Sequence, residues 1–249
     1  MPPSARVSAS LIGLAVVLSA IAASTTVRGD IARGPKTRSE RDQGHAAGPP
    51  PGVHTCNVAR VIAGEAGGRR LAVPAGRDTR PTSDRAREGL FGTVASMVGS
   101  LAGARVLDLY AGSGAVGLEA LSRGARHVLL VESGDRASRV IRQNIEAIGL
   151  PGAELAADRV ARVLARGPDG GRYDLVFADP PYALPDHEVA AMLSALADRA
   201  WLAPGALVIV ERATRSGPLT WPDGFIPDRA RRYGEATIWY GLAPTGLGH

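Results

Sequence analysis

The sequence predicts an α/β fold with a mostly parallel seven-stranded sheet, helices on both of its faces and an antiparallel hairpin at its C-terminal edge. Between residues 105 and 212, short apolar segments alternate with helical segments, a pattern typical of parallel strands joined by crossover helices. The apolar segments 225–233 and 236–241 meet at Gly234-Glu235, which indicates the hairpin. With 249 residues, 45% of them hydrophobic, the chain can bury a core of this size.

Strand and helix segments follow one another regularly through the central part of the chain. The predicted strands are residues 105–110, 127–132, 153–157, 173–178 and 206–212. The predicted helices are residues 114–123, 135–148, 159–166 and 187–200. The dipeptide Pro204-Gly205 predicts a turn immediately before the fifth strand. The main predicted domain therefore comprises residues 101–245.

A hairpin and a helix are expected before this domain, in residues 60–100. Residues 60–64 and 69–73 are short apolar segments containing arginine, separated by Glu-Ala-Gly-Gly. This separation predicts a hairpin, because glycine readily adopts positive φ in tight turns. The Pro-Thr-Ser sequence at 81–83 predicts the start of a helix that continues to about residue 99.

Positive charge is concentrated at the N-terminal edge of the globular part. The chain carries a net charge of +5, and Lys36 is its single lysine among 29 basic residues. Residues 1–59 hold six basic and three acidic residues, and residues 60–92 hold seven arginines and four acidic residues. The rest of the chain is therefore close to neutral, so a polyanion is expected to bind near residues 60–92. The single cysteine, Cys56, excludes an intrachain disulfide and a cysteine-rich metal site.

A glycine-rich turn follows the first strand of the main domain. Gly112, Gly114 and Gly117 satisfy the G-x-G-x-x-G spacing, in which glycine lets a ligand approach the backbone closely. The N-terminus of the next helix offers N–H groups to an anion, which is the pyrophosphate of a dinucleotide or the carboxylate of a methionine-derived methyl donor. The spacing alone therefore admits both a nicotinamide-dependent oxidoreductase and a methyltransferase.

Acidic residues at the ends of three successive strands favour the methyl donor. Asp108 precedes the glycine turn, where it would repel a pyrophosphate but can serve a cationic ammonium or sulfonium group. Glu132 closes the second strand, where an acidic side chain accepts hydrogen bonds from ribose hydroxyls. Asp158 follows the third strand and either accepts a hydrogen bond from an adenine amino group or caps the next helix.

The sequence Asp-Pro-Pro-Tyr at 179–182 follows the fourth strand and predicts the reacting centre. An exocyclic amine on a base is a poor nucleophile, because its lone pair is delocalised into the ring. The Asp179 carboxylate and the Pro180 carbonyl can accept its two N–H bonds and turn the lone pair toward an electrophilic methyl group. Pro181 stiffens this projection, and Tyr182 can stack on the base.

These motifs resemble those of the class I S-adenosylmethionine-dependent methyltransferases, which have a Rossmann-like fold. More narrowly, the chain is similar to the bacterial RsmD family, which methylates N2 of one guanine in 16S ribosomal RNA. The resemblance covers about residues 60–240. It rests on R-V-I-A-G-E-A-G-G-R-R-L (60–71), R-P-T-S-D-R-A-R-E-G-L-F (80–91), D-L-Y-A-G-S-G-A-V-G-L-E-A-L-S-R-G-A (108–125) and D-P-P-Y.

The resemblance implies a cofactor, a substrate and three sets of site residues. S-adenosylmethionine would be held by Asp108, Tyr110, Ala111, Gly112, Ser113, Gly114, Glu132 and Asp158. The target guanine would be held by Asp179, Pro180, Pro181 and Tyr182. The 16S ribosomal RNA, alone or in the small ribosomal subunit, would be contacted by Arg69, Arg70, Arg80, Arg85 and Arg87. No metal and no stable membrane partner is expected, and the sequence does not indicate an oligomeric state.

Three other functions stay open on the residues alone. An adenine-N6 methyltransferase acting on DNA or RNA would use the same acceptors, since the choice of guanine N2 rests on the resemblance. A nicotinamide-dependent oxidoreductase would bind NAD instead of S-adenosylmethionine. A non-catalytic RNA-binding protein would keep the fold without transferring a methyl group.

Residues 1–59 have no counterpart in the family pattern. Leu11–Ala23 is an apolar segment with the length of a signal peptide, and it is too short for a typical transmembrane helix. Residues 27–51 are rich in Gly, Pro, Arg and polar side chains, which predicts a disordered linker. Taken literally, this segment predicts an exported or membrane-tethered protein. The alternative is that the true start lies near Val58 and that the residues before it come from a mis-called start codon. The second interpretation is favoured, because the expected chemistry needs a cytoplasmic methyl donor, and it predicts a cytoplasmic protein.

Overall fold

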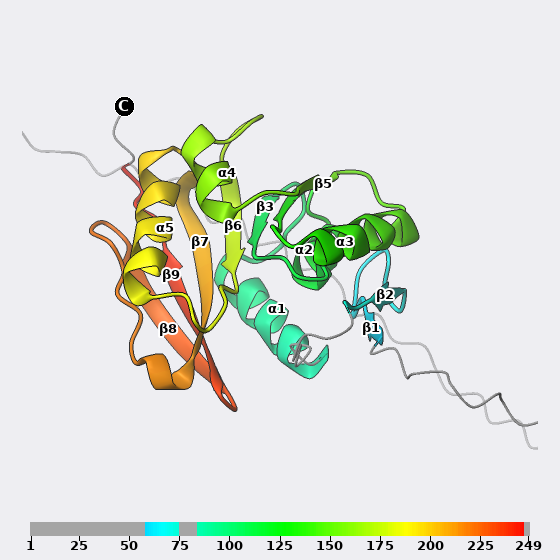
Figure 1. Ribbon diagram of the computed structural model, residues 1–249, viewed down its shortest axis with the longest axis horizontal. Helices are drawn as coiled ribbons and strands as arrows, with labels where there is room; N and C mark the ends of the chain where they lie inside the picture. The colour runs from blue at the N-terminus through cyan, green and yellow to red at the C-terminus, as the bar shows by residue number, and fades with distance from the viewer. Residues whose placement is uncertain (1–57, 75–83, 247–249) are drawn as a thin grey trace, which may run out of the picture. The chain divides into compact units, whose positions relative to one another are not determined.

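A seven-stranded sheet forms the centre of the structure (Figure 1). The computed structural model describes residues 58–74 and 84–246, which belong to one compact unit. In sheet order the strands are β5 (Ala153–Ala156), β4 (His127–Val131), β3 (Arg105–Leu109), β6 (Tyr173–Ala178), β7 (Leu202–Ala213), β9 (Ala236–Leu242) and β8 (Ile226–Tyr233). The first five are parallel, whereas β9 and β8 are antiparallel, so the predicted sheet and its edge hairpin are confirmed.

The strand order reverses direction between β3 and β6. From β3 the chain proceeds outward to β4 and β5, and it then returns to place β6 on the other side of β3. In open α/β sheets, ligands bind outside the carboxyl ends of the strands at such a reversal. The glycine turn after β3 and the Asp-Pro-Pro-Tyr segment after β6 are therefore neighbours at this point.

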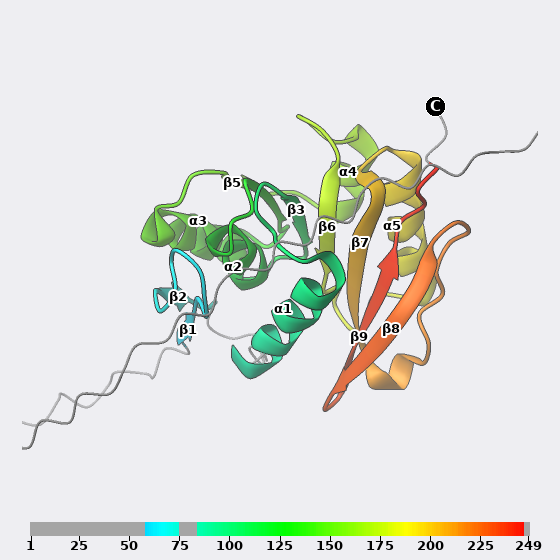
Figure 2. The ribbon, with the colours of Figure 1, turned by 180° about the vertical axis from the view of Figure 1, so that it is seen from behind.

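Helices cover both faces of the sheet (Figure 1, Figure 2). One face packs against α1 (Asp84–Val98), α2 (Ala115–Ser122) and α3 (Asp135–Ile148), and we call it the α1 face. The other packs against α4 (Val160–Arg166) and α5 (Asp186–Asp198), and we call it the α5 face. Side chains alternate between the two faces along each strand, as in β3, where Val106 enters the α1-side core and Leu107 the α5-side core.

The N-terminal hairpin is fixed onto the helices of the α1 face. It pairs β1 (Val58–Arg60) with β2 (Arg70–Ala72), so the predicted hairpin is confirmed, with shorter strands than the sequence suggested. Hydrogen bonds continue across the hairpin beyond the strands, from the Val61 N–H to the Arg69 carbonyl at 2.9 Å and from the Gly68 N–H to the Val61 carbonyl at 2.8 Å. The connecting residues also bond to α2. The Glu119 carboxylate, which is fully buried, accepts the N–H groups of Ile62 at 2.6 Å and Ala63 at 3.1 Å. The hairpin is therefore held rigidly against the main domain.

One local prediction is wrong, and two others lie outside the described residues. The turn predicted at Pro204-Gly205 is wrong, because both residues lie inside β7, in a bulge where the pairing shifts from Tyr173–Leu202 to Leu175–Leu207. The predicted helix start at 81–83 lies outside the described residues, as does the apolar segment Leu11–Ala23. Within the described ranges, no helix is both long and apolar enough to cross a membrane.

Candidate active site

The turn after β3 has a strained backbone. Tyr110 has a φ of 61°, which is uncommon for a residue with a side chain, and Gly112 and Gly114 have φ values of 60° and 77°. The turn is closed by a hydrogen bond of 2.7 Å from the Gly114 N–H to the Ala111 carbonyl. Strain of this kind persists where the surroundings hold it, and it is typical of ligand-binding turns. The Tyr110 side chain packs against the α5-side core, away from the side chain of Asp108.

The Asp108 carboxylate stabilises this turn through a hydrogen bond to the start of α2. Its carboxylate accepts the Gly117 N–H at 2.9 Å, so one of the N–H groups at the start of α2 is already used. The side chain is only 2% exposed. Burial raises the pKa of Asp108 to about 7, the bond from Gly117 opposes this, and the negative charges of Asp179 and Glu132 add to it. A cationic ligand group nearby would favour the ionised form.

Glu132 fixes the other side of the turn. Its two carboxylate oxygens accept the N–H groups of Gly112 at 2.9 Å and Gly134 at 2.7 Å, and the side chain is 4% exposed. A carboxylate offers about four lone-pair positions, so further acceptance from hydroxyl groups of a ligand remains available. Glu132 therefore joins the ends of β3 and β4 at the edge where a ligand is expected.

A further acid of this region, Glu211 of β7, was not predicted from the sequence. Because Ala178 pairs with Val210, Glu211 lies beside Asp179, and both follow core residues of the α1 face by two positions. Glu211 is 7% exposed. Burial, followed by the charge of Asp179, raises its pKa to about 8. An acid at the end of the fifth apolar strand repeats the pattern of the other strand ends, and this signal could have identified it.

The Asp-Pro-Pro-Tyr segment leaves β6 next to the glycine turn. The Asp179 N–H bonds to the Leu109 carbonyl at 3.3 Å, which carries the pairing of β6 with β3 one residue further. Pro180 is buried, whereas Tyr182 is 41% exposed. A bond of 2.8 Å from the Leu184 N–H to the Pro181 carbonyl closes a turn behind the motif. The motif thus projects from the sheet as a stiff loop.

Arg212 anchors this loop from β7. Its side chain is 4% exposed and donates to the Leu184 carbonyl at 2.9 Å and to the Asp186 carboxylate at 2.8 Å. These contacts join the end of the loop to α5 and to the sheet. A charged side chain held in this way restrains the conformation of the residues between Asp179 and Asp186.

Asn144 of α3 links the glycine turn to the N-terminal hairpin. Its Oδ1 accepts the Ala72 N–H at 2.8 Å, and its Nδ2 donates to the carbonyls of Ala72 at 3.0 Å and Ser113 at 2.8 Å. The side chain is 2% exposed. Asn144 was not predicted from the sequence either. Its position three residues after Ile141 and four before Ile148, on the apolar side of α3, was a signal.

A protein-family model described as Conserved hypothetical protein 95 matches residues 59–241 of the chain. The chain belongs to this family. The resemblance identified from the motifs, and with it the Rossmann-like fold, is confirmed by curated and structural relatives. This family membership covers the whole of the site described above.

Three relatives illustrate the similarity. The Ribosomal RNA small subunit methyltransferase D of Escherichia coli K12 is 36% identical over 176 residues, which are 71% of this chain and 85% of that protein. The protein of the same name from Haemophilus influenzae is 33% identical, over 67% of this chain and 84% of its own length. The solved structure of the Escherichia coli methyltransferase yhhF has a TM-score of 0.67 and 31% identity, and it covers 76% of this chain and 99% of that one.

In this family member, the carboxylate of Asp158 is engaged by neighbouring groups. It accepts the Arg159 N–H at 2.7 Å, forms an ion pair with Arg166 and lies 3.7 Å from Arg162. The bond from Arg159, followed by the contact with Arg166, lowers its pKa. An adenine amino group would have to share this carboxylate with α4, so the assignment of Asp158 to the cofactor stays a prediction.

Of the five arginines predicted to contact RNA, three are exposed. Arg69 and Arg70 lie on the hairpin, where Arg69 also donates to the Ile148 carbonyl at the end of α3, and Arg85 lies in the first turn of α1. Arg80 lies outside the described residues.

The prediction for Arg87 is wrong. Its side chain is 2% exposed and donates to the Arg60 carbonyl and to the Asp84 carboxylate, the latter at 2.9 Å. A guanidinium buried in this way joins α1 to β1 and does not present its charge to a polyanion.

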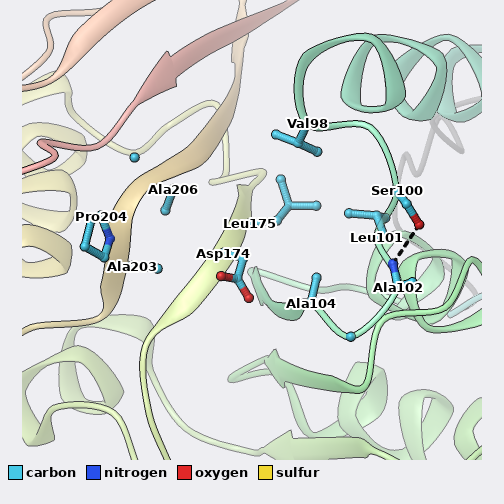
Figure 3. A pocket seen from close by; sticks show the side chains of 12 residues that line it. Val98, Ser100, Leu101, Ala102, Ala104, Asp174, Leu175, Ala203, Pro204 and Ala206 are labelled. Atoms are coloured by element: carbon cyan, nitrogen blue, oxygen red, sulfur yellow. Dashed lines mark hydrogen bonds between the residues drawn. The ribbon is translucent and has the colours of Figure 1, made fainter. Parts of the chain in front are cut away.

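One cavity among the described residues lies away from this site. It has a volume of about 380 Å³ and opens at the amino ends of the strands, between the loop after α1, the start of β6 and the bulge of β7 (Figure 3). Its one charged side chain, Asp174, accepts the Arg105 N–H at 2.8 Å. None of the predicted site residues lines it, so it does not bear on the chemistry. The described residues also contain no group of three or more His, Cys, Asp or Glu side chains arranged to hold a metal ion.

Proposed function

We propose that the protein transfers a methyl group from S-adenosylmethionine to the exocyclic N2 of a guanine in 16S ribosomal RNA. The observation that carries this proposal is the adjacency of two loops at the strand-order reversal. The strained glycine turn ends β3, and Asp179–Tyr182 ends the neighbouring strand β6. The names of the curated relatives, which are methyltransferases of the small-subunit ribosomal RNA, support the substrate.

The residues of the cofactor region fit S-adenosylmethionine. The turn from Tyr110 to Gly114 brings bare backbone to the surface, and two buried acids, Asp108 and Glu132, flank it. Acids in these positions suit a ligand that combines a cationic centre with ribose hydroxyls, and they disfavour the pyrophosphate of NAD. When bound, S-adenosylmethionine supplies an electrophilic methyl group on a sulfonium sulfur.

Catalysis by the protein itself is orientation. The Asp179 carboxylate and the Pro180 carbonyl accept hydrogen bonds from the two N–H groups of the guanine amino group. This arrangement directs the nitrogen lone pair away from the loop and toward the glycine turn. Tyr182, which is 41% exposed, stacks on the base. Fixing the reacting atoms in line lowers the barrier, because the entropy of bringing them together is already lost on binding. The anchor at Arg212 keeps the loop in position.

The exposed arginines bind the RNA. Arg69, Arg70 and Arg85 lie on the hairpin and on the first turn of α1, which are the segments that precede the sheet. Their positive charges neutralise phosphates and fix the register of the RNA, while the base is read in the loop. The small ribosomal subunit or its precursor is the physiological partner, and the protein acts in the cytoplasm.

The test is a methylation assay with three substrates, followed by nucleoside analysis. Labelled S-adenosylmethionine is supplied with 30S subunits, with naked 16S ribosomal RNA and with DNA. We expect N2-methylguanosine from the RNA substrates. N6-methyladenosine as the product would replace the proposed function by that of an adenine methyltransferase.

A pair of variants assigns the reaction to the loop. Asp179→Asn should lose methyl transfer by at least about 100-fold while still binding S-adenosylmethionine in calorimetry. The control is Asp198→Asn, because Asp198 is exposed at the end of α5 and away from the carboxyl ends of the strands. Equal activity of the two variants would remove Asp179 from the catalytic site.

A further inference from the structure

The outermost strand of the sheet, β8, is strongly basic and exposed. It contains Arg229, Arg231 and Arg232 with Asp228 as its one acid, and every residue before Tyr233 is exposed. Arg229 contacts Asp228 through its Nε, but its side chain remains 42% exposed and keeps further donors. The charge totals of the sequence obscured this strand, since acidic residues elsewhere cancel it.

Two of these arginines point to the α1 face, the side of the sheet that holds Asp179. Arg229 pairs with Tyr240, which lies in the α1-side core, and strand alternation gives Arg231 the same side. The pKa of Tyr240 agrees with this. Burial raises it to about 12, and the positive charges of Arg231 and Arg229 act against the rise, so both guanidinium groups lie near the Tyr240 hydroxyl.

Arg231 also lies in the same cross-strand row as Asp179. It pairs with Ile238 of β9, and Ile238 pairs with Glu211 of β7, which lies beside Asp179. Three strand spacings separate the two backbone positions, a distance of about 14 Å at about 4.8 Å per spacing. At this separation, phosphates that flank a target base held at Asp179 are within reach of the β8 side chains.

The end of β8 is joined to the first turns of α1. The Tyr233 hydroxyl packs so closely on Gly89 that a Cβ placed there would lie 2.8 Å from it. Arg85 is four residues before Gly89, hence one turn along the same side of α1. Figure 2 shows α1 between the N-terminal hairpin and the edge of the sheet formed by β8 and β9. Arg85, Arg229 and Arg231 together form what we call the β8 arginine surface.

We propose that the β8 arginine surface binds phosphate groups of the RNA strand that flanks the target nucleotide. This inference rests on the proposed function, because it needs an RNA substrate at Asp179. Charged residues on an edge strand also prevent sheets from joining edge to edge. Protection of the edge needs charged side chains on the strand but does not depend on the face to which they point. Arg229 and Arg231 both point to the face of Asp179, which protection of the edge does not require.

The test compares two double variants that remove the same charge. Arg229→Gln with Arg231→Gln alters the proposed surface. Arg172→Gln with Arg199→Gln is the control, since both residues are exposed near the amino ends of the strands, at the opposite edge from Asp179. The affinity for a 16S ribosomal RNA fragment is measured between about 50 and 200 mM salt, and circular dichroism and thermal unfolding establish that each variant is folded.

We expect the β8 variant to bind RNA about tenfold more weakly at low salt. Two lost phosphate contacts should reduce the slope of log affinity against log salt by about 1.4 to 1.8. The control should change both quantities much less, and binding of S-adenosylmethionine should be equal in both variants. If the two double variants bind RNA equally, the inference is wrong, although wild-type methylation of the RNA would still support the proposed function. If the wild type neither binds nor methylates RNA, the proposed function fails and this inference fails with it.

Discussion

Replacing Asn144 by leucine should destabilise the protein and weaken its binding of S-adenosylmethionine. Leucine has a similar volume but leaves three backbone groups without their partner, namely the Ala72 N–H and the carbonyls of Ala72 and Ser113. Because Asn144 is 2% exposed, water does not readily replace these bonds. At about 1 kcal/mol for each lost bond, the variant should lose about 3 kcal/mol of unfolding free energy.

The effect on the cofactor follows from the bond to Ser113. Asn144 holds Ser113 inside the turn that begins at Tyr110. The φ of 61° at Tyr110 is maintained by contacts with the surrounding residues. Without this restraint the turn relaxes, so binding of S-adenosylmethionine should weaken even in the folded fraction of the variant.

Urea unfolding measures the stability change, and titration calorimetry measures the donor affinity. The matched control is Gln143→Leu, the same type of exchange at the preceding, exposed position of α3. If Asn144→Leu unfolds at the same urea concentration as this control, the linking bonds contribute nothing and the reasoning is refuted. A loss of stability without a loss of donor affinity would restrict the role of Asn144 to seating the hairpin.

Three further outcomes are expected. Gly117→Ala should cost about 1 to 3 kcal/mol of unfolding free energy, because its Cβ would lie 2.6 Å from a methyl group of Leu130, whereas Gly92→Ala, with open space around it, should be neutral or stabilising in the same thermal unfolding assay. Burial and the charge of Asp179 raise the pKa of Glu211 from 4.5 to about 8. The protonated side chain therefore contributes its full stability below about pH 4.5, and this stability is lost as the pH rises through 8. Glu211→Gln should reduce the fall in unfolding free energy over this pH range, measured by urea unfolding at several pH values, and an unchanged fall would contradict the prediction. Arg87→Met should lower the unfolding temperature but leave the RNA affinity of the folded protein unchanged, and a large loss of affinity would restore Arg87 as an RNA contact.

Much of the fold could be read from local pattern. The strands of the main domain match their predicted positions because each is a short apolar segment bounded by a turn, and the edge hairpin was marked by Gly234-Glu235. The turn predicted at Pro204-Gly205 does not form. A bulge inside β7 accommodates these residues, and the pairing with β6 that defines the bulge is not encoded in the dipeptide itself.

The site shows the same division. The shared edge position of Asp108, Glu132 and Asp179 could be predicted because each lies at or next to the end of an apolar strand, and parallel strands bring their carboxyl ends to one edge. Their roles toward a ligand stay predictions. Glu211 escaped notice because its importance depends on lying beside Asp179, which the register of β6 and β7 decides. The same holds for the arginines of α1, because the sequence alone could not show that Arg87 is buried while Arg85 is exposed.

By itself, the sequence determined the class of fold, the position of the glycine turn and the Asp-Pro-Pro-Tyr segment at the end of a strand, because these depend on residue types at short spacings. Only the tertiary structure decided which charges reach the surface and which polar groups are joined inside it. Asn144 bonds to Ala72 across 72 positions of the chain, and Arg231 enters the row of Asp179 through two intervening strands. Burial and cross-strand register arise from contacts between distant residues, so no local pattern contains them.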